Sequence, residues 1–310
     1  MIVVFGSLNA DLVFRAAHLP RPGETVIGRS FAIGPGGKGL NQAVGAGRAQ
    51  GADATPVRFV GAVGNDQFAS TLRNVLTGAG VETGALAMVA GPTGCAGIVV
   101  DDRGENAIVV ASGANQQARS AQVPGDWLSP ETTLVLQMET PSSEVAALLY
   151  RAKRAGARSV LNLAPAMTLP EEALRCATVL VVNEIELAML SAMLALATQP
   201  PEPAARAMAK RLGVHLVVSL GADGAFAVAG PLAWRIGVLK IAPVDTTGAG
   251  DAFVGALAVT LDEGRTLPDA LLRSSIAGGL TCLKPGAASA MPSRAEIEAR
   301  LSELPAAEPV

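Results

Sequence analysis

Residues 179–219 read VLVVNEIELAMLSAMLALATQPPEPAARAMAKRLGVHLVVS, a run in which two kinds of pattern alternate. Val179–Val182 and Leu216–Ser219 are short β-branched segments typical of buried strands, whereas Glu184–Ala197 and Pro203–Leu212 between them have helical periodicity. Strands that are separated by helices within one sheet pair in parallel through a right-handed crossover. This stretch therefore predicts a parallel sheet that is covered by helices.

The same alternation continues along most of the chain. We expect further strands at Ile2–Phe5, Val57–Val63, Leu134–Met138 and Ser159–Leu163, and further helices at Asn41–Gln50 and Ser142–Ala155. Thr198–Pro203 holds three prolines and is expected to be a loop, and Glu303–Val310 is expected to be a frayed tail. The prediction is an α/β fold with a doubly wound, mostly parallel sheet flanked by helices.

Two regions interrupt this alternation. Leu12–Ile33 contains a Pro-Arg-Pro-Gly segment between short alternating stretches, and Thr93–Ala111 has the pattern of two strands around a turn. Neither region is long enough to bury a core of its own. We expect a single domain, residues 1–310, in which the inserts at about 12–33 and 93–111 form a small β-sheet lid over one edge of the main sheet. Separate surface hairpins are the alternative.

The composition excludes several classes of protein. Of 310 residues, 50% are hydrophobic and 16% are charged, so the chain is not a disordered one. The net charge of −3, without a long basic run, argues against an electrostatic nucleic-acid binder. The longest uncharged stretch, Thr83–Val100, contains four glycines and Pro92, so we expect neither a membrane helix nor a membrane partner. No signal peptide is evident.

The cysteines and histidines indicate the redox compartment and limit the kinds of catalytic or metal site that are expected. The three cysteines, Cys95, Cys176 and Cys282, are odd in number and widely spaced, which points to a reducing compartment. The two histidines, His18 and His215, offer no zinc-ligand spacing. We therefore expect a cytoplasmic protein whose chemistry does not use histidine.

Asp245–Asp251 reads DTTGAGD and precedes an apolar run of helical periodicity, Ala252–Leu257. A glycine-rich turn that leads into a helix presents unpaired backbone N–H groups, and together with the helix dipole these favour phosphate. Asp251 then lies beside a phosphate site, where a carboxylate suits the role of a general base for a hydroxyl group. Acidic residues are also common in the first turn of a helix without such a role.

Gly34–Gln42 reads GPGGKGLNQ and contains G-x-G-x-x-G. It lacks the strand–turn–helix context of a dinucleotide site, and Lys38 is followed by Gly39 rather than by the Ser or Thr of a P-loop. Its glycines let the backbone approach a ligand closely, and Lys38 and Asn41 are spaced to face one ligand. The alternative is a flexible loop before a helix.

Other polar residues follow predicted strands, where doubly wound sheets bind ligands. Asn9 and Asp11 alternate and can point to one side, which suits hydrogen bonds to a polyol. Glu139 ends another strand, and Asn183 with Glu186 can hold a hydrated Mg²⁺ or form an ordinary helix-capping pair. Polyol contacts at one end and an anion site at the other predict phosphoryl transfer to a sugar hydroxyl.

These segments, in this order, resemble the ribokinase-like family of sugar and nucleoside kinases nearly end to end. The resemblance is carried by GSLNAD at 6–11, PRPGET at 20–25, GGKGLNQAV at 36–44, the stretches around 94–106, QMETP at 137–141, NLAP at 162–165, VNEIE at 182–186, LGADG at 220–224 and DTTGAGD at 245–251. It implies an ATP-dependent kinase that phosphorylates D-ribose at O5. A sibling kinase for a nucleoside, fructose or another sugar is the alternative, and a non-catalytic sugar sensor is a third reading, against which the intact Asp251 argues.

The resemblance also implies the role of each residue. Asp251 is the expected base, and the expected anion hole is Gly248, Ala249 and Gly250. The expected sugar contacts are Asn9, Asp11, Gly37, Lys38, Asn41, Glu139 and Asp251. The expected ATP contacts are Asn183, Ser219, Gly221, Gly224, Gly250 and Ser275.

Metal ions and a partner chain are implied in the same way. Glu186 is expected to act on Mg²⁺ through water. A monovalent cation, K⁺, is expected beside the anion hole, held mainly through backbone carbonyls of Asp245, Thr247, Thr281, Lys284, Gly286 and Ala290. The family forms dimers through a β-lid, so a homodimer through Leu12–Ile33 and Thr93–Ala111 is expected.

Overall fold

The computed structural model describes residues 1–196 and 200–310. Among these residues, ten strands form one sheet, in the order β14-β13-β12-β11-β10-β9-β8-β1-β4-β5. The parallel strands are β1 (Ile2–Phe5), β4 (Arg58–Val63), β5 (Glu82–Met88), β8 (Thr133–Leu136), β9 (Arg158–Asn162), β10 (Val179–Asn183) and β11 (His215–Ser219). The strands β12 (Ala225–Ala229), β13 (Leu232–Ile236) and β14 (Glu308–Pro309) add antiparallel pairs at one edge. The predicted doubly wound, mostly parallel sheet is confirmed.

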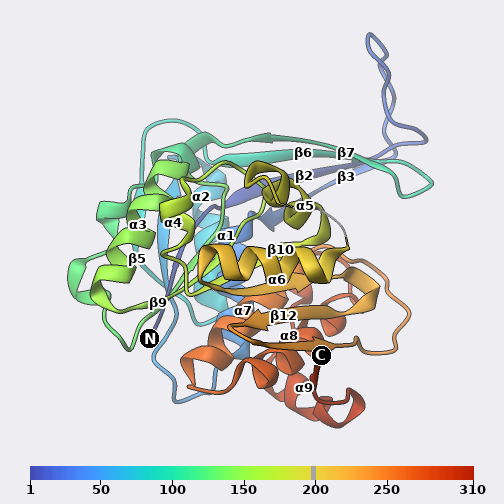
Figure 1. Cartoon of the computed structure of the whole chain (residues 1–310). Coiled ribbons are helices and arrows are strands. Elements are labelled where there is room, and N and C mark those ends of the chain that lie inside the picture. The colour runs from blue at the N-terminus through green and yellow to red at the C-terminus, as the bar shows by residue number, and fades with distance from the viewer. Residues whose placement is uncertain (197–199) are drawn as a thin grey trace.

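Helices cover both faces of this sheet (Figure 1). One face packs against α1 (Lys38–Ala49), α2 (Gln67–Gly78), α7 (Ala249–Asp262), α8 (Leu267–Thr281) and α9 (Arg294–Ala299). The other packs against α3 (Ser142–Ala155), α4 (Glu171–Leu174), α5 (Glu184–Met193) and α6 (Pro201–Leu212). Short 3₁₀ turns lie at Gly113–Gln117, Ser120–Gln122, Gly125–Trp127, Gly221–Asp223, Ala288–Ala290 and Leu301–Glu303.

The central strand β1 shows why both faces are covered. Ile2 and Val4 belong to the core under α1 and α7, whereas Val3 and Phe5 belong to the core on the α3 side. All four side chains are fully buried. Successive side chains of a strand point to opposite faces, so a strand that is apolar at every position requires a layer of helices on each side.

The two inserts form a separate sheet. Its strands are β2 (Asn9–Arg15), β3 (Ser30–Gly36), β6 (Gly94–Val100) and β7 (Asn106–Ala111), in the order β3-β2-β6-β7. The connection between β2 and β3 projects away from the rest of the molecule (Figure 1). The predicted small β-layer is confirmed, with strands that begin and end a few residues outside the expected 12–33 range.

Three local predictions need correction. The segment 303–310 is not a frayed tail, because β14 pairs with β13 and the Val310 amide donates to the Ala233 carbonyl at 3.0 Å. The proline-rich segment begins a helix two residues earlier than expected, since Pro201 lies in the first turn of α6, where the missing amide hydrogen has no partner to lose. The helix α5 ends at Met193, and Ala197 and the start of the predicted loop lie outside the described residues.

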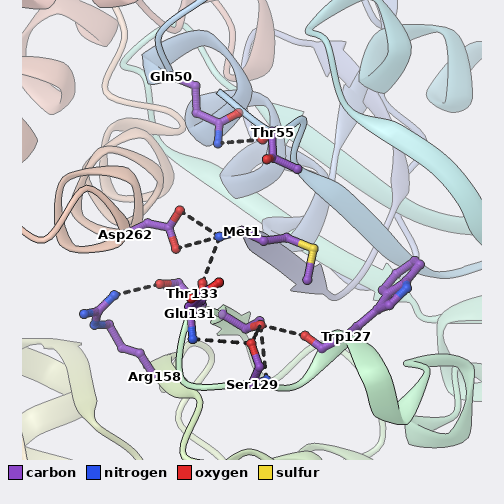
Figure 2. Close-up of polar contacts among 10 residues, drawn as sticks. Met1, Gln50, Thr55, Trp127, Ser129, Glu131, Thr133, Arg158 and Asp262 are labelled. Carbon is purple, nitrogen blue, oxygen red and sulfur yellow. Dashed lines mark hydrogen bonds and ion pairs between the residues drawn. The ribbon is translucent and has the colours of Figure 1, made fainter. Parts of the chain in front are cut away.

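Figure 2 shows polar contacts at the end of the sheet opposite the strand carboxyl ends. The Met1 ammonium lies 3.1 Å from Oδ2 of Asp262, at the end of α7, and donates to the Glu131 carbonyl at 2.9 Å. Arg158 Nη1 donates to Thr133 Oγ1 at 3.0 Å, which joins β9 to β8. These contacts fix the central strands at their amino ends. Within the described part of the chain, no helix has the length and apolar character needed to cross a membrane.

Candidate active site

The site lies where the strand order changes direction, at the carboxyl ends of β1 and β8. Ser7 follows β1, and its hydroxyl donates to Oε2 of Glu139, which follows β8, at 2.6 Å. The same carboxylate oxygen accepts the Lys38 backbone N–H at 2.9 Å, and Ser7 Oγ accepts the Gly39 N–H at 3.1 Å. Glu139 therefore holds the first turn of α1 against the sheet. A strand, β3, directly precedes this helix, but it belongs to the small sheet and forms no βαβ unit.

Asp251 lies in the first turn of α7 and is buried. Its Oδ2 accepts a hydrogen bond from Asn41 Nδ2, and its Oδ1 accepts one from Gln42 Nε2, both at 3.0 Å. The turn before the helix depends on Gly248, which has a φ of +78° and whose missing Cβ would lie 2.8 Å from that of Ala287. The absence of a side chain at Gly248 thus allows the N-terminus of α7 to lie close to the loop at Ala287. Gly248 and Gly250 both line a cavity at this end of the helix.

The predicted anion hole is partly engaged already. The Ala249 N–H donates to the Thr246 carbonyl at 3.3 Å. The helix α7 has no side-chain cap, so the N–H groups of Gly250 and Asp251 keep the unpaired character of a helix N-terminus. A positive helix end with free donors is suited to a phosphate group.

Charge in the site is concentrated around Asp251 and Lys38. Burial raises the pKa of Asp251, while the positive charge of Lys38 and the hydrogen bonds from Gln42 and Asn41 act to lower it. The negative charge of Asp251, and next that of Glu139, raises the pKa of Lys38 despite its burial. A half-buried ammonium thus lines the same cavity as the carboxylate proposed from the sequence as a base.

A chain of buried amides supports Asp251, and sequence reasoning gave these side chains no role. Gln42 Nε2 also donates to Asn162 Oδ1 at 3.0 Å, and Gln137 Nε2 donates to Gln42 Oε1 at 2.8 Å. Gln42 lies inside the GGKGLNQ motif, and Gln137 and Asn162 lie at the ends of β8 and β9. Their positions at strand carboxyl ends were the available signal.

The small sheet contributes Asn9 and Asp11 from β2. Asn115 receives the Leu8 N–H, donates to the Leu8 carbonyl, and donates to Asn9 Oδ1 at 2.8 Å, so it orients Asn9. Burial raises the pKa of Asp11 to about 7, helped by the negative charges of Glu139 and Asp251. The Asp11 carboxylate packs where a Cβ of Gly36 would stand. Asn115 is a second group that the sequence did not reveal.

The expected nucleotide residues are distributed along one edge. Asn183 caps α5, because its side chain accepts the Glu186 N–H at 2.8 Å while Glu186 Oε2 accepts the Asn183 N–H at 2.9 Å. The capping alternative is therefore realised. Burial raises the pKa of Glu186, whose side chain also faces Lys38. Ser219 ends β11, and Ser275 is buried within α8.

One cavity gathers seven of the predicted residues. It is lined by Lys38, Asn183, Glu186, Ser219, Gly248, Gly250 and Asp251, with Asn162, Ala164, Val181, Phe253 and Val254. A second cavity is lined by Asn9 and Glu139 among others. Gly221, Gly224 and Ser275 do not line either of them. Both glycines have positive φ, and Gly224 passes so close to Ile236 that a Cβ would lie 1.9 Å from its carbonyl oxygen.

The residues expected around a monovalent cation lie on two linked loops. Asp245 Oδ1 accepts the N–H and the hydroxyl of Thr247 at 2.9 and 2.6 Å, and Oδ2 accepts the Gly286 N–H at 2.8 Å. The hydroxyl of Thr281 donates to the Ala277 carbonyl, and the ammonium of Lys284 pairs with Glu296. Ala290 is buried in a 3₁₀ turn. Across residues 1–196 and 200–310, no cluster of three His, Cys, Asp or Glu side chains is arranged to hold a metal ion.

Comparisons with known proteins agree with this geometry. Residues 1–294 match the model of the pfkB family of carbohydrate kinases. A ribokinase from Haemophilus influenzae is 33% identical over 298 residues, which cover 95% of this chain and 96% of that protein. Among solved structures, a Thermotoga maritima ribokinase superposes with a TM-score of 0.89 at 34% identity, covering 97% of this chain and 99% of that one. An Arabidopsis thaliana ribokinase solved with ribose and ATP gives 0.85 at 31% identity, covering 97% and 98%. The chain belongs to the pfkB family of carbohydrate kinases.

Proposed function

We propose that this chain is an ATP-dependent kinase that phosphorylates D-ribose at O5, giving D-ribose 5-phosphate. Relatives that match nearly the whole chain are named ribokinases, and one of them has been solved with ribose and ATP. The observation that carries the proposal is the place of Asp251, a buried carboxylate at the N-terminus of α7 that lines the cavity beside Lys38. A carboxylate and a bound phosphate repel each other, so a carboxylate at this position is explained if it takes a proton from the bound substrate.

In this proposal Asp251 takes the proton from the O5 hydroxyl as the oxygen attacks the γ-phosphorus of ATP. The N–H groups of Gly248 and Gly250, with that of Ala249 once it leaves the Thr246 carbonyl, stabilise the negative charge on the transferred phosphoryl group. The sugar is held by the side chains of Asn9, Asp11, Lys38, Asn41 and Glu139 and by the backbone at Gly37. Support comes from Oδ1 of Asn41, a buried oxygen without a hydrogen-bond partner among the described residues, which a sugar hydroxyl can satisfy.

The nucleotide is proposed to lie along Asn183, Ser219, Gly221, Gly224, Gly250 and Ser275. Glu186 fits a hydrated Mg²⁺ because its carboxylate lines the same cavity and its capping contact uses one oxygen, Oε2. Mg²⁺ commonly binds through one or two carboxylates, waters and substrate phosphates. When bound, it would neutralise phosphate charge.

A monovalent cation, with K⁺ as the proposed ion, fits the loops joined by Asp245. The Asp245 carboxylate already accepts three hydrogen bonds, and the side chains of Thr281 and Lys284 have partners of their own. Backbone carbonyls of Asp245, Thr247, Thr281, Lys284, Gly286 and Ala290 therefore remain the proposed ligands. The ion would stiffen the loop that precedes the anion hole.

The small sheet is proposed to act as the lid of a single domain and as the dimer interface. Its strands β2, β3 and β7 expose large apolar side chains, between 40% and 75% exposed, at Phe14, Phe31, Ile33, Ile108, Val109 and Val110. An exposed apolar sheet with free edges requires a cover, and a second copy of the chain can supply it. The expected cytoplasmic location stays a prediction.

The test is a kinase assay with ribose, 2-deoxyribose, fructose and adenosine under identical Mg²⁺ and K⁺. We expect the highest kcat/KM with ribose and a product phosphorylated at O5. A site built to hydrogen-bond hydroxyls disfavours an analogue that lacks one, so 2-deoxyribose should be a poorer substrate. If fructose or adenosine outranks ribose, a sibling kinase activity replaces the proposal. If ATP is not consumed with any of them, a sugar sensor does.

A further inference from the structure

The strongest unassigned feature is the amide chain behind Asp251. The Gln42 side chain is fully buried, and each of its polar atoms is engaged. Its Nε2 group donates to Asp251 Oδ1 and to Asn162 Oδ1, and its Oε1 accepts from Gln137 Nε2. Gln42 itself does not line the cavity, and it reaches the site through two residues that do, Asp251 and Asn162.

We infer that Gln42 is a positioning residue for the proposed general base, locked in its donor orientation by Gln137 and Asn162. The inference rests on the proposed function, since it concerns how Asp251 does its work. Gln42 is not a catalytic residue, because it does not touch the substrate.

The lock follows from donor and acceptor chemistry. Asn162 Nδ2 donates to the Val181 carbonyl at 3.2 Å, so its Oδ1 is left to accept from Gln42. Gln137 Nε2 donates to Gln42 Oε1. If the Gln42 amide were reversed, two donors would face each other at Gln137 and two acceptors would face each other at Asp251 and Asn162. Only one orientation of Gln42 satisfies all three neighbours.

This orientation also determines which lone pairs of Asp251 are free. A carboxylate has about four acceptor sites. Asn41 and Gln42 take one site on each oxygen, from the α1 side. Asp251 also lines the cavity, so its remaining acceptor sites are available to a hydroxyl group bound there. Loss of the Gln42 contact would allow the carboxylate to rotate, and misplacement by about 1 Å costs on the order of 100-fold in rate.

The charge on Asp251 depends on the same contact. Lys38 faces Asp251 from α1, Glu139 from the end of β8, Glu186 from α5 and Asp11 from the small sheet. Of these, only Lys38 favours the ionised carboxylate. The hydrogen bonds from Gln42 and Asn41 act in the same direction, against burial. Removal of the Gln42 donor should therefore raise the pKa of Asp251 further. As the pH falls, the carboxylate would then be protonated, and the enzyme inactivated, at a higher pH than in the wild type.

The experiment compares Gln42→Met, which keeps length but removes the amide, with Gln122→Met as the matched control. Gln122 donates to the Gly61 carbonyl at 2.8 Å, away from the cavity. For Gln42→Met we expect kcat to fall about 10- to 100-fold, KM for the sugar to change little, and the acid limb of the kcat–pH profile to move to higher pH. Gln122→Met should keep the wild-type kcat and profile.

Gln137→Met provides the independent variant, because it removes only the lock on Gln42. It should lower kcat less than Gln42→Met and move the pH profile in the same direction. If Gln42→Met does not fold, the kcat and pH profile of Gln137→Met test the positioning role of Gln42 in its place. A wild-type kcat and profile in the folded Gln42 or Gln137 variant overturns the inference, as does a loss confined to sugar KM.

The outcome is separable from a failure of the proposed function. If the wild-type chain phosphorylates no sugar, the function fails. If the wild type is active and Asp251→Asn is inactive while Gln42→Met is normal, only the role of Gln42 fails.

Discussion

Asn41 Nδ2 donates to Oδ2 of Asp251 at 3.0 Å, although the two residues are 210 positions apart in the sequence. The contact joins the first turn of α1 to the first turn of α7, and α1 and α7 pack closely along their length. Two glycine-rich motifs thereby meet in one site. The glycines allow the helices to approach, and the polar residues that follow them face each other.

The first prediction concerns Asp251→Asn. An asparagine has one acceptor oxygen, so it can accept from Asn41 or Gln42 but not from both, and it cannot take a proton. We expect turnover to fall about 10²–10⁴-fold. Steady-state kinetics measure the effect, and thermal unfolding checks that the variant is folded. Near-normal kcat in this variant would exclude Asp251 as the base.

A second prediction follows from the Asp11 carboxyl, whose pKa burial raises to about 7. Hydrogen bonds from sugar hydroxyls are stronger to an ionised carboxylate. The dissociation constant for ribose should therefore fall as pH rises through about 7. Calorimetric titration between pH 6 and pH 8 measures this, with Asp11→Asn as the control that should lose the pH dependence. Equal slopes for the two proteins would contradict the role of Asp11.

The same group predicts a change in stability. The folded protein holds the Asp11 proton more tightly than the unfolded chain does, so Asp11 destabilises the fold increasingly as pH rises from about 4 to about 7. Asp11→Asn should thus unfold at a higher temperature than the wild type at pH 8, and the difference should shrink toward pH 4. A melting-temperature difference that does not depend on pH would be inconsistent with the raised pKa.

Many of the helices and strands could be predicted from local sequence patterns. Ile2–Phe5 and Ser142–Ala155 are strand and helix with the predicted bounds, because each is an unbroken period bounded by turn residues. The hairpin of β12 and β13 was not predicted. Its first strand, Ala225–Ala229, is mostly alanine and has no β-branched run, although its partner strand, β11, lies directly before it in the chain. The pairing of β14 with β13 depends on a contact more than 70 residues away, which no local pattern encodes.

In the candidate active site too, some residues could be predicted from local sequence and others could not. The motifs predicted helix starts at Asn41 and Asp251 because glycine-rich turns are local features, and the two side chains meet in the structure. The supporting groups Gln42, Gln137 and Asn162 could not be recognised, because a buried amide is identified only by the partners that other strands bring to it. Glu139 was expected at the site, but its contacts with Ser7 and the Lys38 amide appear only after folding.

A third prediction concerns Asp66, which joins α2 to the start of β6. Its carboxylate caps α2 through the Phe68 and Ala69 N–H groups and accepts the N–H and hydroxyl of Thr93, each at 2.7 Å. Burial acts to raise the pKa of Asp66, but these hydrogen bonds outweigh it and lower the pKa. Asp66→Ala should cost about 2 kcal/mol of stability near neutral pH, and this contribution should disappear as the pH falls below about 4.

Thr93→Ser is the matched control for Asp66→Ala, because it keeps the N–H contact and the hydroxyl, which donates to Asp66 and accepts the Gly64 N–H. Its loss of stability in urea unfolding should be smaller, about 1 kcal/mol, since only a methyl group is removed. If Asp66→Ala is as stable as the wild type at pH 7, the carboxylate does not hold the base of the small sheet.

The fourth prediction is activation by K⁺. The Asp245 carboxylate ties the 245–247 loop to Gly286, and a bound cation would order the same two loops ahead of the anion hole. Activity should rise when K⁺ replaces tetramethylammonium at constant ionic strength, and Asp245→Ala should weaken the response. A flat response in protein depleted of monovalent cations would exclude the proposed site.

The last prediction is a dimer held by the small sheet. Val109 lies on β7, at the free edge of the sheet, and is 75% exposed, with Ile108 and Val110 beside it at 55% and 50%. Burial of such side chains drives association, and each contributes about 1.5–3 kcal/mol when fully covered. Sedimentation at micromolar concentration should therefore show a dimer. Val109→Asp should shift it toward the monomer, since a carboxylate in the interface would lose its hydration.

Leu232→Asp is the control, because Leu232 is 58% exposed on β13, in the other sheet. The partner copy would also brace the strand pair that carries Asp11, so KM for ribose should rise as Val109→Asp dissociates. A fully active wild-type monomer would exclude the interface and leave the kinase assignment intact.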